Sequence, residues 1–347
     1  MSQRQLLIDR GPGETRAVVL LDGRPERLLI ERPGESQPRV GDRYAARVVQ
    51  VDKLGGLAFL DLGGRDAVLR LKAERAPPVQ GAMLDVEITA EAQREKAAVA
   101  RSGGPADGEP RRLEGTLNLE ARLQAHDKRA RINRDPETRQ IADEAEAEAL
   151  AVVHPLPGGG SVAIEPTRAL VAVDVDLGGR SGVAGETKKL ARQTNMAAIG
   201  ETARLLRLKG LGGLIVIDLI GHSHDGVAIM NAAKIAFAPD QPGVVIGPIT
   251  RFGTLELSLP QRSRPVAEIL LDPDGRPSAA TLAVRMLRAV EREARADPGG
   301  RFEVRCAPEV AEAAQARAPV LADRIGGRFA VVADSALDRG RYIIGRP

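Results

Sequence analysis

Apolar segments near the N-terminus alternate with glycine-containing loops. Three such segments, separated by G-P-G-E and D-G-R-P, predict an antiparallel meander with strands at residues 5–9, 15–21 and 27–31. Strands of this number and length bury little apolar surface by themselves. We therefore expect the meander to join a sheet formed elsewhere in the chain.

Residues 37–102 contain five further short apolar segments with tight glycine turns, which predict an OB-fold barrel. The expected strands are 44–51, 57–62, 67–71, 83–89 and 96–100. An OB-fold binds single-stranded nucleic acid through rings and charges on its strand face, and Phe59 and Lys96 are candidates for these contacts. A core position for Phe59 would explain this aromatic residue equally well.

The central part of the chain has the pattern with the most chemical content. Residues 170–176 alternate, which places Asp174 and Asp176 on the same face of one strand. A helix over 188–209 and an apolar strand that ends in Asp218 follow. Strand, helix and strand form a βαβ unit, so the two strands are expected to be parallel neighbours with their aspartates close together.

Two carboxylates on neighbouring strands can hold Mg²⁺, which prefers oxygen ligands and retains several waters. A bound Mg²⁺ activates water and stabilises charge on a scissile phosphate, and the third carboxylate, Asp176, can orient a ligand or a water. Aspartates at strand ends also commonly cap turns, so the spacing alone leaves both interpretations open. The apolar strands before the acids, and the Arg- and Lys-rich helix between them, favour a metal site beside an RNA-binding surface.

The remaining segments carry less chemical information. Residues 102–110 have the composition of a linker, residues 111–150 resemble charged helix, and a strand is expected at 244–251. The last unit is predicted to be a small α/β domain with helices at 279–296 and 309–323 and strands at 301–306, 329–332 and 341–345. His222 and His224 form an H-x-H pair without a third ligand, so a solvated loop is expected there.

Composition narrows the class of protein. With 347 residues, the chain is expected to form about two to four compact units. Aromatic residues make up only 2%, so a nucleic-acid site cannot depend on many stacked rings. The one cysteine, Cys306, excludes an internal disulfide and a cysteine zinc site and indicates a reduced, cytoplasmic protein. No apolar run approaches about 20 residues, so no membrane span is expected.

Four longer motifs lie within residues 155–258. They are P-G-G-G-S-V-A-I-E-P-T-R-A-L-V-A-V-D-V-D, Q-T-N-M-A-A, A-R-L-L-R-L-K-G-L-G-G-L-I-V-I-D-L-I and R-F-G-T-L-E-L. Together they resemble the catalytic core of the ribonuclease E/G family. The resemblance implies a multidomain α/β and α+β fold. Its parts would be a split RNase H-like domain (1–36 and 111–169), an inserted OB-fold barrel (37–102), a DNase I-like catalytic domain (170–265) and a small C-terminal α/β domain (266–347).

The resemblance also implies an activity. Members are endoribonucleases that use Mg²⁺, or Mn²⁺ in its place, to hydrolyse single-stranded RNA in RNA processing or decay, leaving 5′-phosphate and 3′-hydroxyl ends. Asp174 and Asp218 match the two metal-binding aspartates, and Asp176 stands where the family has asparagine. On the same basis the expected RNA contacts are Phe59 and Lys96 on the barrel, and Arg204, Arg207, Lys209, Arg251 and the base platform Phe252 on the catalytic unit.

The chain departs from the family in several places. The segment between residues 101 and 155 is too short for the 5′-monophosphate sensor domain of larger members, which implies indifference to the 5′ phosphate state. P-Q-R-S-R-P replaces the Cys-x-x-Cys zinc link that joins protomers, so no zinc and a monomer are expected. Gly221 replaces a second acid. These changes leave open an RNA-binding protein with weak or no nuclease activity, whereas a sugar or nucleotide phosphatase would not explain the OB-fold.

Overall fold

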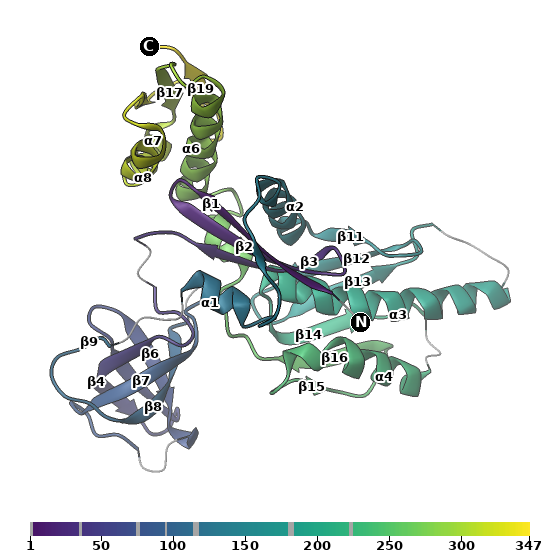
Figure 1. Ribbon diagram of the computed structural model, residues 1–347. Coiled ribbons are helices and arrows are strands. Elements are labelled where there is room, and N and C mark those ends of the chain that lie inside the picture. The colour runs from purple at the N-terminus through teal and green to yellow at the C-terminus, as the bar shows by residue number, and fades with distance from the viewer. Residues whose placement is uncertain are drawn as a thin grey trace.

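The computed structural model describes residues 3–34, 37–73, 77–93, 96–113, 118–179, 184–221 and 225–347. Figure 1 shows a central body of two sheets and their helices, a barrel beside this body, and a small α/β unit that ends at the C-terminus. The mixed α/β character agrees with the sequence expectation. No helix within these ranges is long and apolar enough to span a lipid bilayer.

The N-terminal sheet consists of the predicted meander and one short additional strand. Its strands are β1 (Arg4–Gly11), β2 (Glu14–Leu21), β3 (Arg24–Glu31) and β10 (Ile132–Asn133). They are arranged in the order β10–β1–β2–β3, antiparallel except for the parallel pair β10 and β1. The prediction that the meander joins a sheet formed elsewhere in the chain is therefore wrong. The meander forms a sheet of its own, to which only the short strand β10 is added. Helices α1 (Leu119–Gln124) and α2 (Thr138–Leu150) stabilise it by packing against its strands.

Helix α1 is much shorter than the charged helical segment expected in this region. Asn118 caps its start by accepting a hydrogen bond from the Ala121 amide. Beyond its end, Asp127 Oδ1 accepts hydrogen bonds from the amides of Arg129 (2.9 Å) and Ala130 (3.2 Å). Because the aspartate side chain satisfies these amides, a turn replaces further helix.

Strands between residues 43 and 105 form a barrel of OB-like topology, as predicted. They are β4 (Arg43–Asp52), β5 (Leu57–Asp61), β6 (Asp66–Arg70), β7 (Met83–Ala90) and β8 (Ala98–Pro105), with a short 3₁₀ turn at Leu71–Ala73. Their order is β5–β6–β8–β7–β4, with β4 also pairing with β5, and β6 and β8 run parallel. The predicted linker is wrong over residues 102–105, because they extend β8 and pair with β7. On leaving the barrel, β9 (Arg111–Arg112) pairs with β4.

The central sheet has the strand order β11–β12–β13–β14–β16–β15. The strands are β11 (Val153–Pro155), β12 (Ser161–Pro166), β13 (Val171–Asp176), β14 (Gly213–Asp218), β15 (Val245–Ile246) and β16 (Thr254–Leu259). As predicted, β13 and β14 are parallel and are connected through α3 (Ala184–Lys209). The strand expected over 244–251 is much shorter in the structure, where only β15 (Val245–Ile246) is formed. The Thr250 amide donates to the Thr254 carbonyl (2.9 Å) and closes a turn before β16.

Helix α3 lies between the two sheets, contacting β12 and β13 on one side and β3 on the other. One face of the central sheet, including Val173, Ile217 and Leu257, is buried in this core. The opposite face is open, and Leu214 on it remains 46% exposed. Helices α4 (Gly226–Ala236) and α5 (Val266–Leu270) and a 3₁₀ turn at Ala238–Asp240 complete the body.

The C-terminal unit has the predicted α/β arrangement. It contains α6 (Ala279–Ala296), β17 (Phe302–Cys306), α7 (Pro308–Gln315), α8 (Ala318–Ile325), β18 (Phe329–Ala333) and β19 (Tyr342–Gly345), with strand order β18–β17–β19. The single helix expected over 309–323 is divided into α7 and α8. Pro319 lies in the first turn of α8, where it has no amide to continue the hydrogen bonding of α7.

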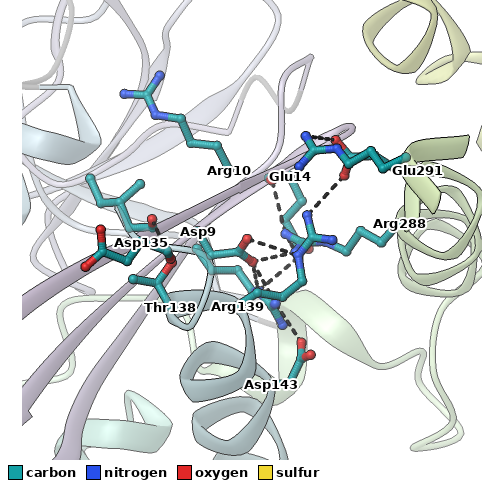
Figure 2. A network of polar contacts seen from close by, with 12 residues as sticks. Asp9, Arg10, Glu14, Asp135, Thr138, Arg139, Asp143, Arg288 and Glu291 are labelled. Carbon is teal, nitrogen blue, oxygen red and sulfur yellow. Dashed lines mark hydrogen bonds and ion pairs between the residues drawn. The ribbon is translucent and has the colours of Figure 1, made fainter. Parts of the chain in front are cut away.

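An ionic network joins the C-terminal unit to the N-terminal sheet (Figure 2). Asp9 on β1 accepts hydrogen bonds from Arg16 on β2 (2.7 Å) and from Arg288 on α6. Glu291, also on α6, accepts a hydrogen bond from Arg139 on α2 (3.0 Å). Because both α6 residues and Asp9 are buried, these bonds fix α6 against the meander and α2.

Candidate functional site

Asp174 and Asp218 are paired across two parallel strands. In the register of β13 and β14, Asp174 lies directly opposite Asp218, and both residues are exposed. Neighbouring strands are separated by about 4.8 Å, so the two carboxylates can reach a common ion. The sequence predicted this proximity from the βαβ pattern.

The alternation of β13 and β14 explains why the acids point outward. Val173 and Val175 are buried in the core, which turns Asp174 and Asp176 to the open face of the sheet. On β14, buried Ile217 turns Asp218 to the same face. A shift of either strand by one residue would bury a carboxylate and expose the valines or isoleucine, so the register is strongly specified.

A shallow pocket of about 280 Å³ surrounds the three acids, lined by Asp174–Leu177 and Asp218–Ile220. Within the part of the chain that the structure describes, the carboxylates of Asp174 and Asp218 have no hydrogen-bond or ion-pair partner. Asp176 does have one, because its Oδ1 accepts a hydrogen bond from the Gly178 amide (3.1 Å). The turn-capping interpretation of strand-end aspartates therefore describes Asp176 and not the other two.

The donor set fits Mg²⁺ better than zinc. Mg²⁺ is commonly held by one or two carboxylates together with waters and substrate phosphates, which matches two unpartnered carboxylates on an open face. A structural zinc site needs four ligands, and among the residues described no group of three or more His, Cys, Asp or Glu side chains has an arrangement that could hold a metal ion by itself. His222 and His224 lie outside the described residues.

A turn that carries Arg251 and Phe252 lies at the same end of the sheet. Thr254, the first residue of β16, pairs with Asp218, so the turn just before it lies beside the aspartates. Phe252 is 72% exposed, and the Arg251 guanidinium lies 4.8 Å from the centre of its ring. An exposed ring supported by a cation is suited to stacking on a base.

The region that contains these residues matches known proteins. Residues 116–263 match the model of the Ribonuclease E/G family. The chain is 40% identical over 118 residues to ribonuclease E of Haemophilus influenzae and 36% identical over 148 residues to ribonuclease E of Escherichia coli. It is 33% identical over 120 residues to the chloroplastic ribonuclease E/G-like protein of Arabidopsis thaliana.

Residues 116–263, less than half of the 347-residue chain, thus carry a region of the ribonuclease E/G family. The three alignments cover 33%, 40% and 34% of this chain but only 12%, 14% and 12% of the respective relatives. The family match includes both paired aspartates and the turn at Arg251 and Phe252, whereas the barrel and the C-terminal unit lie outside it.

The three basic residues predicted from α3 do not belong to an RNA surface, although the family match includes them. Arg204 is only 6% exposed and pairs with Glu201 (2.6 Å). The Arg207 guanidinium is bonded to Asp240 (2.8 Å), and Lys209 donates to two carbonyls at the end of α2. Burial lowers the pKa of Lys209 to about 8. These side chains hold α3 in the body and cannot reach a ligand outside.

The two other residues predicted to contact RNA, Phe59 and Lys96, lie on the barrel. Phe59 on β5 is 40% exposed and lies outside the barrel core, so the alternative core position is wrong. Lys96 is exposed and pairs with Gln93 at the end of the loop between β7 and β8. On the neighbouring strand β6, Val68 pairs directly with Phe59.

Asn195 is a site residue to which the sequence assigned no role. It is buried on α3, and its amide donates to the Ile220 carbonyl (3.0 Å) and accepts from the Ile220 amide (3.0 Å). Ile220 comes two residues after Asp218, so these two hydrogen bonds fix the backbone that leaves β14. The signal was present in the Q-T-N motif, since a buried amide in a helix that faces strand ends needs backbone partners.

Proposed function

We propose that this chain is a metal-dependent endoribonuclease that hydrolyses single-stranded RNA in RNA processing or decay. The observation that carries the proposal is the pairing of Asp174 with Asp218 on neighbouring parallel strands of the region that matches the family. Both carboxylates are exposed and unpartnered among the described residues, which supports a role in binding a ligand rather than in holding the fold.

Asp174 and Asp218 are the residues that would hold Mg²⁺, or Mn²⁺ in its place. When bound, the ion supplies an activated water and stabilises charge on the scissile phosphate. Asp176 holds the turn after β13 through its bond to Gly178 and thereby positions Asp174. Arg251 contacts the RNA backbone and Phe252 stacks on a base next to the cleaved bond, with Phe59 and Lys96 binding a second segment of the strand on the barrel.

The arrangement of units supports the domain order of the family. The N-terminal sheet, together with α1 and α2, corresponds to a split RNase H-like domain interrupted by the barrel. Residues 170–265 correspond to a DNase I-like catalytic domain, and residues 266–347 to a small C-terminal domain. Because residues 102–154 leave no room for a 5′-sensor domain, cleavage is indifferent to whether the substrate carries one 5′ phosphate or three.

The second candidate is an RNA-binding member of the family with weak or no nuclease activity. Two observations favour it. The third carboxylate, Asp176, is engaged with the Gly178 amide, and Gly221 stands where an acid is expected. Among the residues described, only two carboxylates are therefore left unpartnered to hold an ion at this pocket.

Cleavage of an end-labelled single-stranded RNA distinguishes the two candidates. The nuclease cuts the RNA in Mg²⁺ or Mn²⁺ and not in EDTA, and its products carry 5′-phosphate ends that a phosphate-specific ligation detects. Binding of the RNA without cleavage in either metal would decide for the binding protein. A strong preference for 5′-monophosphorylated over 5′-triphosphorylated RNA would contradict the proposed indifference to the 5′ end.

A further inference from the structure

A pocket of about 510 Å³ lies between the N-terminal meander and the barrel, where the chain enters the barrel after β3 and leaves it through β9 (Figure 1). Pockets that bind small molecules commonly have about 300–1,000 Å³, so this one has room for a ligand larger than inorganic phosphate. Its lining shares no residue with the pocket at the aspartates. A ligand bound here therefore does not occupy the proposed nuclease centre.

Arginines dominate the charged part of this lining. The described lining residues include one acid, Glu31, and five arginines; the arginines are Arg32, Arg39, Arg65, Arg111 and Arg112. Ion pairs to Glu14, Glu31 and Asp42 hold three of these guanidinium groups in place. A concave wall with more guanidinium than carboxylate groups attracts anions.

Arg111 offers this wall a charge that is already oriented. Its Nη1 donates hydrogen bonds to the carbonyls of Asp107 (3.0 Å) and Glu109 (3.1 Å), which fix the guanidinium and leave Nη2 available. No acid pairs with Arg111 within the part of the chain that the structure describes. Guanidinium groups bind phosphate oxygens through strong charge-assisted bonds. Arg111 can therefore bind a phosphate group without first giving up an ion pair.

The segment that carries Arg111 is packed against the turn between β5 and β6. Gly63 in this turn has a φ of 95°, and a Cβ atom there would lie 2.9 Å from the Pro110 carbonyl oxygen. Glycine permits both the conformation and the close approach. In the same turn the Leu62 amide donates to the Arg65 carbonyl (2.8 Å). These contacts bring Arg65 and Arg111 to the same pocket.

The hydroxyl of Tyr44 is a second, independent feature that indicates a ligand. Tyr44 is only 5% exposed, and its ring packs in the barrel core while the residue also lines the pocket. Among the described residues its hydroxyl has no hydrogen-bond partner, although buried polar groups are normally hydrogen-bonded. Burial raises the pKa of Tyr44, and the neighbouring guanidinium groups of Arg65 and Arg112 lower it by less. The hydroxyl therefore keeps its proton and can donate it in a hydrogen bond to an anion.

The rest of the lining suits a sugar. It contains neutral hydroxyl and amide side chains together with apolar ones, including Thr15, Gln37, Asn118, Leu62 and Pro110. Neutral donors and acceptors bind sugar hydroxyls, and apolar side chains cover the carbon atoms between them.

We propose that this pocket binds a small molecule with a phosphate group on a sugar, of the size of a nucleoside monophosphate. Arg111 and the neighbouring guanidinium groups bind the phosphate, Tyr44 donates to a phosphate oxygen, and the neutral side chains bind the sugar. Because the lining comes from both the meander and the barrel, the ligand holds these two units together. This binding goes beyond the proposed nuclease function and does not require it.

Isothermal titration calorimetry of the full chain with AMP, ribose 5-phosphate and inorganic phosphate tests the proposal. AMP and ribose 5-phosphate should bind with a Kd of about 0.1 mM or lower, and inorganic phosphate should bind about tenfold more weakly or worse because it leaves the sugar contacts unmade. Arg111→Ala should raise the Kd for AMP about 10- to 100-fold and Tyr44→Phe about tenfold, as expected for lost hydrogen bonds to a charged group.

The two variants are suited to this test because neither should unfold the protein. Tyr44→Phe keeps the ring in the barrel core, and Arg111 has no acid partner among the described residues, so both should melt near the wild-type temperature without ligand. Saturating AMP should raise the melting temperature of the wild-type protein and not that of Arg111→Ala. The control Arg101→Ala removes an exposed barrel arginine that pairs with Glu87 (2.9 Å) outside the pocket, and it should bind AMP as the wild type does.

Failure of AMP and ribose 5-phosphate to bind the wild-type protein would overturn the proposal, as would equal Kd values for the wild type, Arg111→Ala and Tyr44→Phe. Displacement of AMP from the Asp218→Asn variant by an RNA of about 12 nucleotides would also overturn it, because the pocket would then belong to the RNA surface. Asp218→Asn should otherwise bind AMP like the wild type. A missing nuclease activity and a missing ligand site are therefore distinguished.

Discussion

Asp174 and Asp218 lie opposite each other in the register of two parallel strands, at the point where both strands leave the core. The burial of every second residue on β13 and β14 fixes this register, so the backbones of the two aspartates cannot move apart without exposing the core. The backbone positions of the pair are therefore fixed before any ligand binds. Rigid placement of ligands reduces the cost of ordering them in a complex.

Asp176 is predicted to act through the turn that it caps. Asp176→Ala removes the acceptor for the Gly178 amide and is expected to lower metal-dependent cleavage about tenfold or more, as changes beside metal ligands do. Asp176→Asn retains an acceptor oxygen and should restore cleavage to near the wild-type rate. Initial rates of RNA cleavage at saturating Mg²⁺ measure both effects. Loss of activity in both variants would assign a direct metal-binding role to this carboxylate.

Asn195 is predicted to position the end of β14. Asn195→Ala leaves the partly buried amide and carbonyl of Ile220 without their side-chain partner, which should cost about 1–3 kcal/mol of unfolding free energy. Cleavage should fall about 10- to 100-fold while the Kd for RNA stays nearly constant. Urea unfolding and filter binding measure these quantities. The control Gln193→Ala, at an exposed position of the same helix, should change stability by less than about 0.5 kcal/mol.

The turn before β16 is predicted to contribute to RNA affinity. Phe252→Ala removes an exposed ring and should weaken binding by about 1–3 kcal/mol. Arg251→Ala should reduce the slope of log K against log salt concentration by about 0.7, the value for one released counterion on a single strand. Arg346→Ala, in the C-terminal unit, serves as the control and should leave the slope unchanged. Equal slopes for all three proteins would exclude Arg251 from the RNA surface.

The buried network around Asp9 is predicted to be needed for folding. Arg288→Met leaves Asp9 with fewer partners in the core and should cost about 3–5 kcal/mol. Arg295→Ala on the same helix removes a guanidinium that is 62% exposed, and it should cost less than about 1 kcal/mol. Denaturant unfolding of the two variants should therefore differ clearly. Equal losses would mean that the network contributes little beyond surface pairing.

The same network predicts a dependence of stability on pH. Burial alone raises the pKa of Asp9, but the guanidinium groups of Arg288 and Arg16 outweigh burial and hold this pKa below its usual value. The stabilisation from Asp9 is therefore complete above the usual carboxyl pKa of about 4 and is lost as the pH falls through the lower folded value. Asp9→Asn, although less stable at pH 7, should show a weaker loss of unfolding free energy in acid. Parallel acid profiles would contradict this.

Much of the site followed from the sequence because local patterns determine it. Alternation placed Asp174 and Asp176 on one face, and the βαβ connection brought Asp218 to the neighbouring strand, as the structure has them. The OB-like barrel followed from its strand and turn spacing in the same way.

Contacts between distant segments could not be predicted in this way. Arg204 has the sequence context of a solvated helix face, but Glu148 of α2 and the Pro25 carbonyl of the meander surround it in the fold. The glycine-rich residues 102–105 have the composition of a linker and become strand because β7 offers them backbone partners. The docking of Glu91 on the segment after β16 likewise depends on residues about 170 positions apart.

We propose that Asp174 and Asp218 together form a metal-dependent nuclease centre. The most direct test is the rate of cleavage of a labelled single-stranded RNA, measured as a function of Mg²⁺ concentration for the wild-type protein and for Asp218→Asn. We expect metal-dependent cleavage by the wild-type protein and a loss of about 100-fold or more in the variant, with RNA binding retained. Equal cleavage by the two proteins, or cleavage by the wild type that persists in EDTA, would contradict it.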